Sequence, residues 1–135
     1  MEPLPYVDEH CRQVAATPER TWDALGRLVR RLTRPAPAAL AALWRLEPTS
    51  GFAVAEETAP HHLALRGRHR FARYELAFDV DRARDGATLR ARTSAEFAGV
   101  AGRAYRALVI GSGGHALLVR QMLRQIARSA ERFPS

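Results

Sequence analysis

The sequence contains no lysine and no asparagine, and it has a single cysteine, Cys11. One cysteine cannot form a disulfide bond within the chain and cannot supply a cysteine-rich zinc site. In the strand that we expect around it, Cys11 acts as a small apolar residue. The absence of lysine, together with abundant alanine, indicates a bias toward codons rich in G and C.

Long apolar runs are missing as well. No stretch approaches the roughly 18 apolar residues that a membrane-spanning helix requires. The opening MEPLPYVDEH lacks the basic and apolar regions of a signal peptide. We therefore expect a soluble, cytoplasmic protein without a membrane span. A chain of 135 residues is long enough to bury a core, and we expect one domain over residues 1–135.

Positive charge exceeds negative charge, because 21 arginines against 14 acidic residues give a formal net charge of +7. Such an excess points to nucleic acid or an anionic surface when it is clustered. The arginines are spread from Arg12 to Arg132, with no block of five or six. We expect solvated, salt-bridged surfaces and no nucleic-acid partner. An arginine-rich interaction module for an acidic partner stays as the least favoured alternative.

The N-terminal third predicts a strand followed by two helices. Residues 6–15 form the expected strand. Thr17 is suited to cap a helix and Pro18 to begin it, because the N–H that proline lacks would be unsatisfied there. Apolar residues recur at helical spacing as far as Leu32, and prolines follow. A short second helix is expected over 37–46, with an apolar stripe of Leu40, Leu43 and Trp44.

Between residues 51 and 98 the hydrophobic period changes to two, which is typical of half-buried strands. Strands are expected around 52–54 and 63–65. Two longer strands are expected over 74–81 and 89–97, and their polar faces oppose acidic residues to arginines, which favours antiparallel pairing.

Two turns are expected to connect these strands. Asp85 and Gly86 form a strong hairpin dipeptide between the two longest strands. We place the preceding turn at Gly67, because Phe71 is out of phase with the alternation that begins at Tyr74. That mismatch indicates a bulge or bend nearby.

The last segment returns to helical spacing from Gly114 to Arg132, a length of about 28 Å. One face is basic, with arginines at 120, 124 and 128. The opposite face is apolar and consists of Val119, Met122, Ile126, Ala130 and Phe133.

The glycines before this helix resemble a nucleotide-binding loop. Gly111, Gly113 and Ala116 fit the pattern G-x-G-x-x-G/A, and the apolar run YRALVI precedes them. A Rossmann unit needs a further strand after its first helix, and only 14 residues follow Gln121. We therefore expect no dinucleotide and no other cofactor, and interpret IGSGGH as a tight bend before the final helix.

The expected elements are compatible with one compact α+β arrangement. A curved antiparallel sheet wraps around the long C-terminal helix, and the two short helices after the first strand close one end. This is the helix-grip fold. The chain resembles a bacterial member of the START-like, or SRPBCC, superfamily of polyketide cyclases and lipid-transfer domains. The resemblance rests on VAATPERTWDAL (14–25), GRHRFARYELAF (67–78) and GRAYRALVIGSGGHALLVRQML (102–123).

The resemblance implies a cavity between the sheet and the final helix for an apolar or amphipathic small molecule. The middle of the chain offers fewer strands than the family has. We expect the ligand to contact side chains from the strands, the segment before the final helix and that helix itself. These candidate ligand-binding residues are His69, Phe71, Tyr74, Leu76, Phe78, Phe97, Tyr105, His115 and Met122.

Two histidines are the candidates for chemistry in this cavity. His69 lies beside aromatic residues, where a histidine can act as a general base or orient a ligand carbonyl. The alternative is a turn or surface histidine. His115 opens the final helix and either meets a ligand or serves as a packing and capping residue.

Other clusters do not indicate a site. His61 and His62 are adjacent, and neighbouring strand residues point to opposite faces, so they cannot easily chelate one ion. Glu56 and Glu57 fail as a carboxylate pair for the same reason. We expect no metal site.

The sequence therefore favours a domain that binds a hydrophobic or amphipathic small molecule. The alternative is a cyclase- or dehydratase-like enzyme in which a cavity histidine acts as acid or base. An enzyme needs several polar groups that converge on one point, so the structure of the site separates the two. A homodimer is compatible with the sequence.

Overall fold

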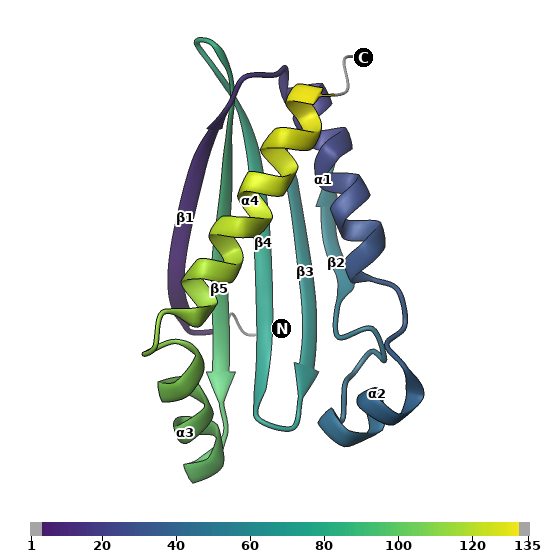
Figure 1. The fold of residues 1–135 in the computed structure, drawn as a ribbon, viewed down its shortest axis with the longest axis vertical. Coiled ribbons are helices and arrows are strands. Elements are labelled where there is room, and N and C mark those ends of the chain that lie inside the picture. The colour runs from purple at the N-terminus through teal and green to yellow at the C-terminus, as the bar shows by residue number, and fades with distance from the viewer. Residues whose placement is uncertain (1–3, 133–135) are drawn as a thin grey trace.

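A five-stranded antiparallel sheet forms one layer of the molecule, in the order β1-β5-β4-β3-β2 (Figure 1). The computed structural model describes residues 4–132, so the predicted core position Phe133 lies outside the described residues. The strands are Tyr6–Val14 (β1), Ala53–Thr58 (β2), His62–His69 (β3), Ala72–Ala83 (β4) and Gly86–Phe97 (β5). The helices are Pro18–Leu32 (α1), Ala38–Trp44 (α2), Gly99–Val109 (α3) and Gly114–Arg132 (α4).

The start of α1 follows the predicted capping chemistry. The Thr17 hydroxyl accepts a hydrogen bond from the Arg20 N–H at 3.1 Å, and Pro18 occupies the first turn. Leu25, Leu28 and Val29 are buried, as their helical spacing predicted. The prediction for this helix is confirmed.

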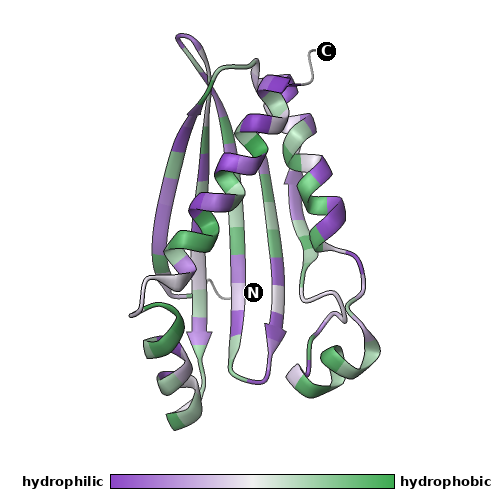
Figure 2. Ribbon diagram, viewed as in Figure 1, coloured by the Kyte–Doolittle hydropathy of each residue, from purple (hydrophilic) through white to green (hydrophobic). Residues whose placement is uncertain are grey.

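Alternation along β4 and β5 creates one apolar and one polar face (Figure 2). Phe78 faces Ala91 and Val80 faces Leu89 across the two strands, and all four are buried. On the polar face, Arg73 Nη2 lies 2.6 Å from Glu96 Oε2. The antiparallel pairing of the two strands is confirmed.

The turn between β3 and β4 lies at residues 70–71, so its predicted place at Gly67 is wrong. Gly67 is inside β3, opposite Tyr74. Glycine is needed there for a different reason, since a Cβ atom on Gly67 would lie 1.9 Å from the carbonyl oxygen of Gly51. Close approach of two backbones, and not a turn, accounts for this glycine.

The long helix α4 lies across the apolar face of the sheet and begins and ends at the predicted residues. Val119, Leu123 and Ile126 are buried against the sheet, whereas Arg120 and Arg124 are exposed. Near its end, Glu131 Oε2 accepts a hydrogen bond from the Ala15 N–H at 2.9 Å. Apolar packing on the sheet and this hydrogen bond therefore both fix the position of α4.

The two helices after β1 take different places. The helix α1 lies alongside α4 on the same face of the sheet (Figure 1), so it does not close an end as expected. The short helix α2 lies near the end of the sheet where β3 turns into β4. Of its predicted apolar stripe, Leu40 and Leu43 are exposed, whereas Trp44 is half-buried against His69 and Phe71.

The helix α3 was not among the predicted elements. It follows β5 and brings the segment RAYRALV to the end of the sheet nearest the start of α4. Together, the sheet, α3 and α4 define the helix-grip arrangement. Within residues 4–132 no helix is long and apolar enough to cross a membrane.

Candidate functional site: a cavity between the sheet, α3 and α4

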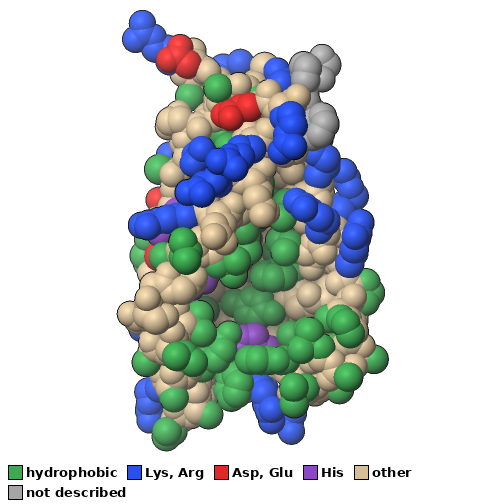
Figure 3. Space-filling model, in the orientation of Figure 1, with side chains coloured by type: hydrophobic (Ala, Val, Ile, Leu, Met, Phe, Trp, Pro, Cys, Tyr) green, Lys and Arg blue, Asp and Glu red, His purple; other side chains and the backbone are tan. Residues whose placement is uncertain are grey.

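A cavity of about 320 Å³ lies between the inner face of the sheet, α3 and the first half of α4. A hollow is visible on this side of the molecule, with hydrophobic side chains inside it and around its lower rim (Figure 3). The cavity lies at the small end of the size range of small-molecule sites. Its lining is mostly apolar and includes Leu76, Phe97, Leu118, Val119 and Met122.

The register between β4 and β5 builds the floor of the cavity. Residues two apart on a strand share a face, so three successive inner pairs of these strands lie side by side. The pairs are Ala72–Phe97, Tyr74–Ala95 and Leu76–Thr93, and all six residues line the cavity. The small side chains at 72 and 95 leave the space that larger residues would fill.

Aromatic rings close one end of the cavity. The ring of His69 lies 5.0 Å from that of Tyr105 and 5.8 Å from that of Trp44, both edge to face. Phe71 stacks on Tyr105 at 5.2 Å between centroids. Such arrangements are favourable for aromatic pairs. This cluster joins α2, the β3–β4 turn and α3, and thereby fixes Tyr105 at the cavity.

His69 has a defined tautomer in its neutral state. Its Nδ1 accepts a hydrogen bond from the Phe71 N–H at 3.1 Å, which leaves Nε2 to carry the proton. Burial lowers the pKa of His69 below its usual value, because water that would solvate the charged ring is excluded. The ring is therefore a neutral hydrogen-bond donor at neutral pH.

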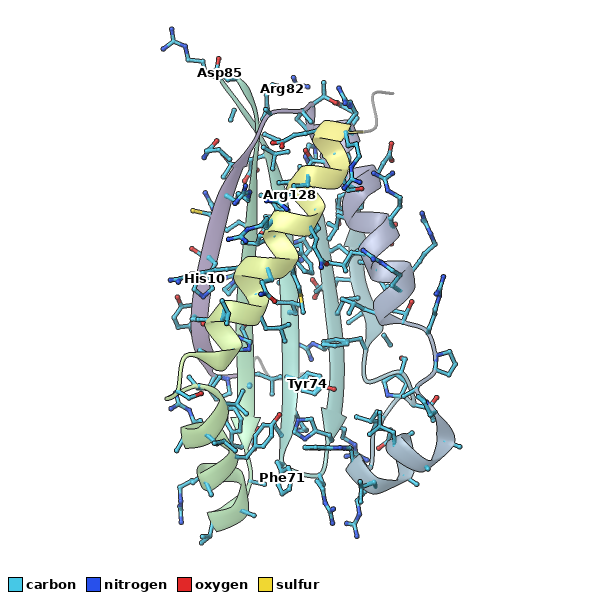
Figure 4. All side chains as sticks on the ribbon, viewed as in Figure 1. His10, Phe71, Tyr74, Arg82, Asp85 and Arg128 are labelled. Carbon is cyan, nitrogen blue, oxygen red and sulfur yellow. The ribbon has the colours of Figure 1, made fainter. Side chains whose placement is uncertain are left out.

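The two tyrosines differ in their hydroxyl groups. The Tyr74 hydroxyl donates a hydrogen bond to the Gly51 carbonyl oxygen at 2.6 Å, and Figure 4 shows Tyr74 on the inner side of the sheet. Burial, with a smaller contribution from Tyr105, raises the pKa of Tyr74 to about 12. Burial also raises the pKa of Tyr105. Within residues 4–132 the Tyr105 hydroxyl makes no hydrogen bond, so it is available to a ligand.

A polar cluster lies on the opposite side of the cavity, beside the start of α4. His115 Nε2 lies 3.0 Å from the Thr93 hydroxyl and 3.4 Å from Asp8 Oδ1. The other carboxylate oxygen of Asp8 lies 3.1 Å from His10 Nε2. His115 and Thr93 line the cavity, and Asp8 and His10 stand behind them on β1.

Most of the candidate ligand-binding residues meet at this cavity. It is lined by His69, Tyr74, Leu76, Phe97, Tyr105, His115 and Met122. Phe71 does not line it, and its ring stacks on that of Tyr105 at the lower end of the sheet (Figure 4). Phe78 does not line it either. It shares a face with Leu76 but lies one pair farther along β4, where it is fully buried in the core.

Several lining residues were not predicted. Phe52 comes from the loop before β2 and packs on Tyr74 with ring centroids 5.3 Å apart. Val109 and Ile110 come from the end of α3 and the residue after it. Because α3 was not predicted, its apolar residues could not be assigned to the cavity. Leu118 and Val119 had a signal in the sequence, since Val119 belongs to the predicted apolar face of α4 and Leu118 adjoins it.

The adjacent residues His61 and His62 lie at the start of β3. His62 begins β3, and its ring lies 2.7 Å from Asp79 and 3.3 Å from Glu56. The hydrogen bond to Asp79 is the main reason that the pKa of His62 is raised. In the part of the chain that the structure describes, no group of three or more His, Cys, Asp or Glu side chains is placed to hold a metal ion.

The glycine segment joins two helices. Ile110 to Gly113 separate α3 from α4, and Gly113 has a φ of 82°, a left-handed conformation that favours glycine. The run YRALVI lies mainly in α3, so a helix and not a strand precedes the loop. The interpretation of IGSGGH as a bend before the final helix is confirmed.

Comparisons with known proteins reveal similarity in fold. No family model matches the chain, and no curated protein matches its sequence. A conserved protein from Geobacillus kaustophilus has a TM-score of 0.61 and 16% identity, covering 92% of this chain and 94% of its own. A protein from Chromobacterium violaceum also has a TM-score of 0.61 and 16% identity, with coverages of 97% and 100%.

A third similar structure is StfQ, the di-domain ARO/CYC of the steffimycin biosynthetic pathway. Its TM-score is 0.57 at 14% identity, and the match covers 95% of this chain and 51% of StfQ. This chain therefore spans about half of that protein. At these identities the similarity shows the fold alone: the chain is an α+β protein of helix-grip type.

Proposed function

We propose that this protein binds a hydrophobic or amphipathic small molecule in the cavity between the sheet, α3 and α4, as a member of the START-like superfamily. The observation that carries the proposal is the composition of the lining, which is apolar except for a few side chains that hold hydrogen-bonding groups. Such a lining is typical of ligand sites. The cytoplasmic location stays a prediction.

The polar groups restrict the ligand further. Tyr105 has a free hydroxyl, and the neutral His69 ring carries its proton on Nε2, so both offer a donor. Their rings lie 5.0 Å apart. We infer a ligand with an apolar body and a hydrogen-bond acceptor, such as a carbonyl oxygen, at the end that meets these donors. Apolar contact supplies most of the affinity, at about 25 cal/mol per Å² removed from water.

A titration with an environment-sensitive apolar dye tests this proposal. In the Ala95→Phe variant a ring fills the cavity from its floor, and we expect dye binding to fall by about tenfold or more. The control is Ala101→Phe, the same substitution at an exposed position of α3 outside the cavity. Circular dichroism establishes that both variants are folded. Equal binding by wild type and Ala95→Phe would exclude this cavity as the dye site.

A cyclase- or dehydratase-like activity is the second candidate, and the cluster around His115 favours it. His115 touches both Thr93 and Asp8, so an imidazole in the cavity wall has a hydroxyl and a carboxylate beside it. A carboxylate next to a histidine orients the ring and stabilises its charged form during proton transfer. In a dehydration, His115 would remove a proton from the carbon next to a ligand carbonyl, and a C=C bond would form as the bond to the β-hydroxyl breaks. The proton would then leave with that hydroxyl as water.

A poly-β-ketone thioester analogue tests this second candidate. We expect the wild type to turn this analogue over, and His115→Gln to do so at least about 10²-fold more slowly, the typical contribution of general acid–base catalysis. His62→Gln, which changes a histidine on the polar face of the sheet, is the control. Dye binding without turnover in the wild type would leave the protein a carrier.

A further inference from the structure

Two helices bring arginines from distant parts of the chain into one groove. Arg27, Arg30 and Arg31 of α1, with Arg34 just after it, face Arg128 and Arg132 of α4 across a groove of about 620 Å³. The prediction that the arginines are dispersed is therefore wrong for these six, because packing of α1 on α4 unites residues about a hundred positions apart. Figure 3 shows the basic side chains over both helices, above the hollow.

Four arginines of the groove have no carboxylate partner among the described residues. The described lining of the groove consists of the six arginines with Gln125 and Ser129, and contains no carboxylate. Arg30, Arg31, Arg34 and Arg128 form no ion pair with a carboxylate within residues 4–132. The neighbouring acidic residues Asp23 and Glu57 line a separate depression on the other side of Arg27 and Arg30.

Part of the groove is held in place. Arg27 donates to the Ser129 hydroxyl from Nε at 3.1 Å and from Nη2 at 2.7 Å, so its guanidinium bridges the two helices. Like charges three and four residues apart destabilise a helix, and this spacing separates Arg27 from Arg30 and Arg31. The helix dipole favours Arg30 and Arg31 at the end of α1, but it does not explain why Arg128 faces them from α4.

We propose that the groove between α1 and α4 is a binding site for a small polyanion with two or more phosphate groups. Planar guanidinium groups match phosphate oxygens through paired hydrogen bonds, and several arginines around one concave surface bind adjacent phosphates together. The bound groups are those of a free oligophosphate or of phosphorylated lipid headgroups. This site shares no lining residue with the cavity, so it does not depend on the function proposed there.

Isothermal titration with sodium tripolyphosphate, against sodium chloride of equal ionic strength, tests the proposal. The groove variant carries Arg30→Gln, Arg31→Gln and Arg128→Gln. The control variant carries Arg84→Gln, Arg92→Gln and Arg103→Gln, which remove the same charge from exposed positions outside the groove. We expect one site in the wild type and the control, and an affinity lower by about tenfold or more in the groove variant. Both variants are first checked for folding by circular dichroism.

Cosedimentation with phosphatidylcholine vesicles, with and without phosphatidylinositol bisphosphate, distinguishes the two sources. Binding only to the vesicles with phosphatidylinositol bisphosphate, again lost in the groove variant, would assign the site to lipid headgroups. If the groove variant and the control variant lost equal affinity for tripolyphosphate, net charge alone would attract the anion, and the proposal would be overturned. So would the absence of binding to either probe. Dye binding in the cavity is expected to be unchanged in the groove variant.

Discussion

At the scale of single residues, Gly67 shows how closely β3 and the loop at Gly51 approach each other. A methyl group at residue 67 would collide with the Gly51 carbonyl oxygen and would lie 3.0 Å from the Tyr74 hydroxyl. We expect Gly67→Ala to lower the free energy of unfolding by about 1–3 kcal/mol, the usual cost of overpacking. Urea denaturation of the wild type and the variant measures this change in the free energy of unfolding.

Gly26 provides the matched control, because a Cβ atom there meets only the end of the Arg30 side chain at 3.6 Å. In the middle of α1, alanine is a better helix former than glycine. Gly26→Ala is expected to raise the free energy of unfolding by about 0.5–1 kcal/mol. Equal effects of the two substitutions would contradict the close approach at Gly67.

Titration of His69 predicts a pH dependence of ligand binding. Its pKa is already lowered by burial, and a bound apolar molecule removes more water from the ring. Binding therefore opposes protonation, and the affinity for the dye is expected to fall as the pH drops through the lowered pKa of His69, below the usual range of a histidine. We expect weaker dye binding at pH 5 than at pH 8.

Other titratable groups also face the cavity, so the assignment needs variants. They are His115, Glu75, which is paired with Arg66, and the two tyrosines. His69→Gln should flatten the profile, whereas His115→Gln should leave most of it. A profile that persists without His69 would assign the proton to another group.

The residues of the candidate site could be predicted only where they lie in strands or helices with a periodic hydrophobic pattern. A period of two places Leu76 and Phe78 on the same face of β4. It does not say how far along the strand the cavity extends, which depends on where α4 crosses the sheet. Phe78 was therefore predicted to contact the ligand and lies in the core instead.

At the scale of elements, the helices differ in how clearly the sequence encodes them. The helix α4 has a regular apolar face, and its bounds were predicted. The helix α3 buries only Gly102 and contains two glycines near its start, which lower its helix propensity. Its end carries the β-branched Val109, which favours strands. Its position therefore depends on tertiary contacts such as the stacking of Tyr105 on Phe71.

Two leucines of α4 test how this helix is oriented. Leu123 is 2% exposed in the core, whereas Leu117 is 59% exposed. We expect Leu123→Ala to lower the free energy of unfolding by about 2–5 kcal/mol, through the loss of apolar contacts and the cavity left behind. Leu117→Ala should change it by less than about 0.5 kcal/mol. Comparable losses from both variants, measured by urea denaturation, would contradict this orientation.

At the scale of the whole molecule, the packing of the sheet against the long helix could be predicted from the sequence, whereas the arginine groove and the full lining of the cavity could not. The alternating strands and the long amphipathic helix can be packed in few ways, which led to the helix-grip fold. The arginine groove depends on the contact between α1 and α4, and neither helix shows it alone. The cavity likewise combines the β4–β5 register with Phe52, Val109 and Ile110, which lie outside the clearly periodic segments.

The methyl group of Met122 gives the most direct test of ligand binding in the cavity. The chain has two methionines, and Met122 lines the cavity. Methyl-labelled methionine therefore gives two NMR signals, and the Met122→Leu variant identifies the one from α4. On titration with the apolar dye, we predict a saturable shift of the Met122 signal. Dye binding that leaves the Met122 signal in place would contradict the proposed function.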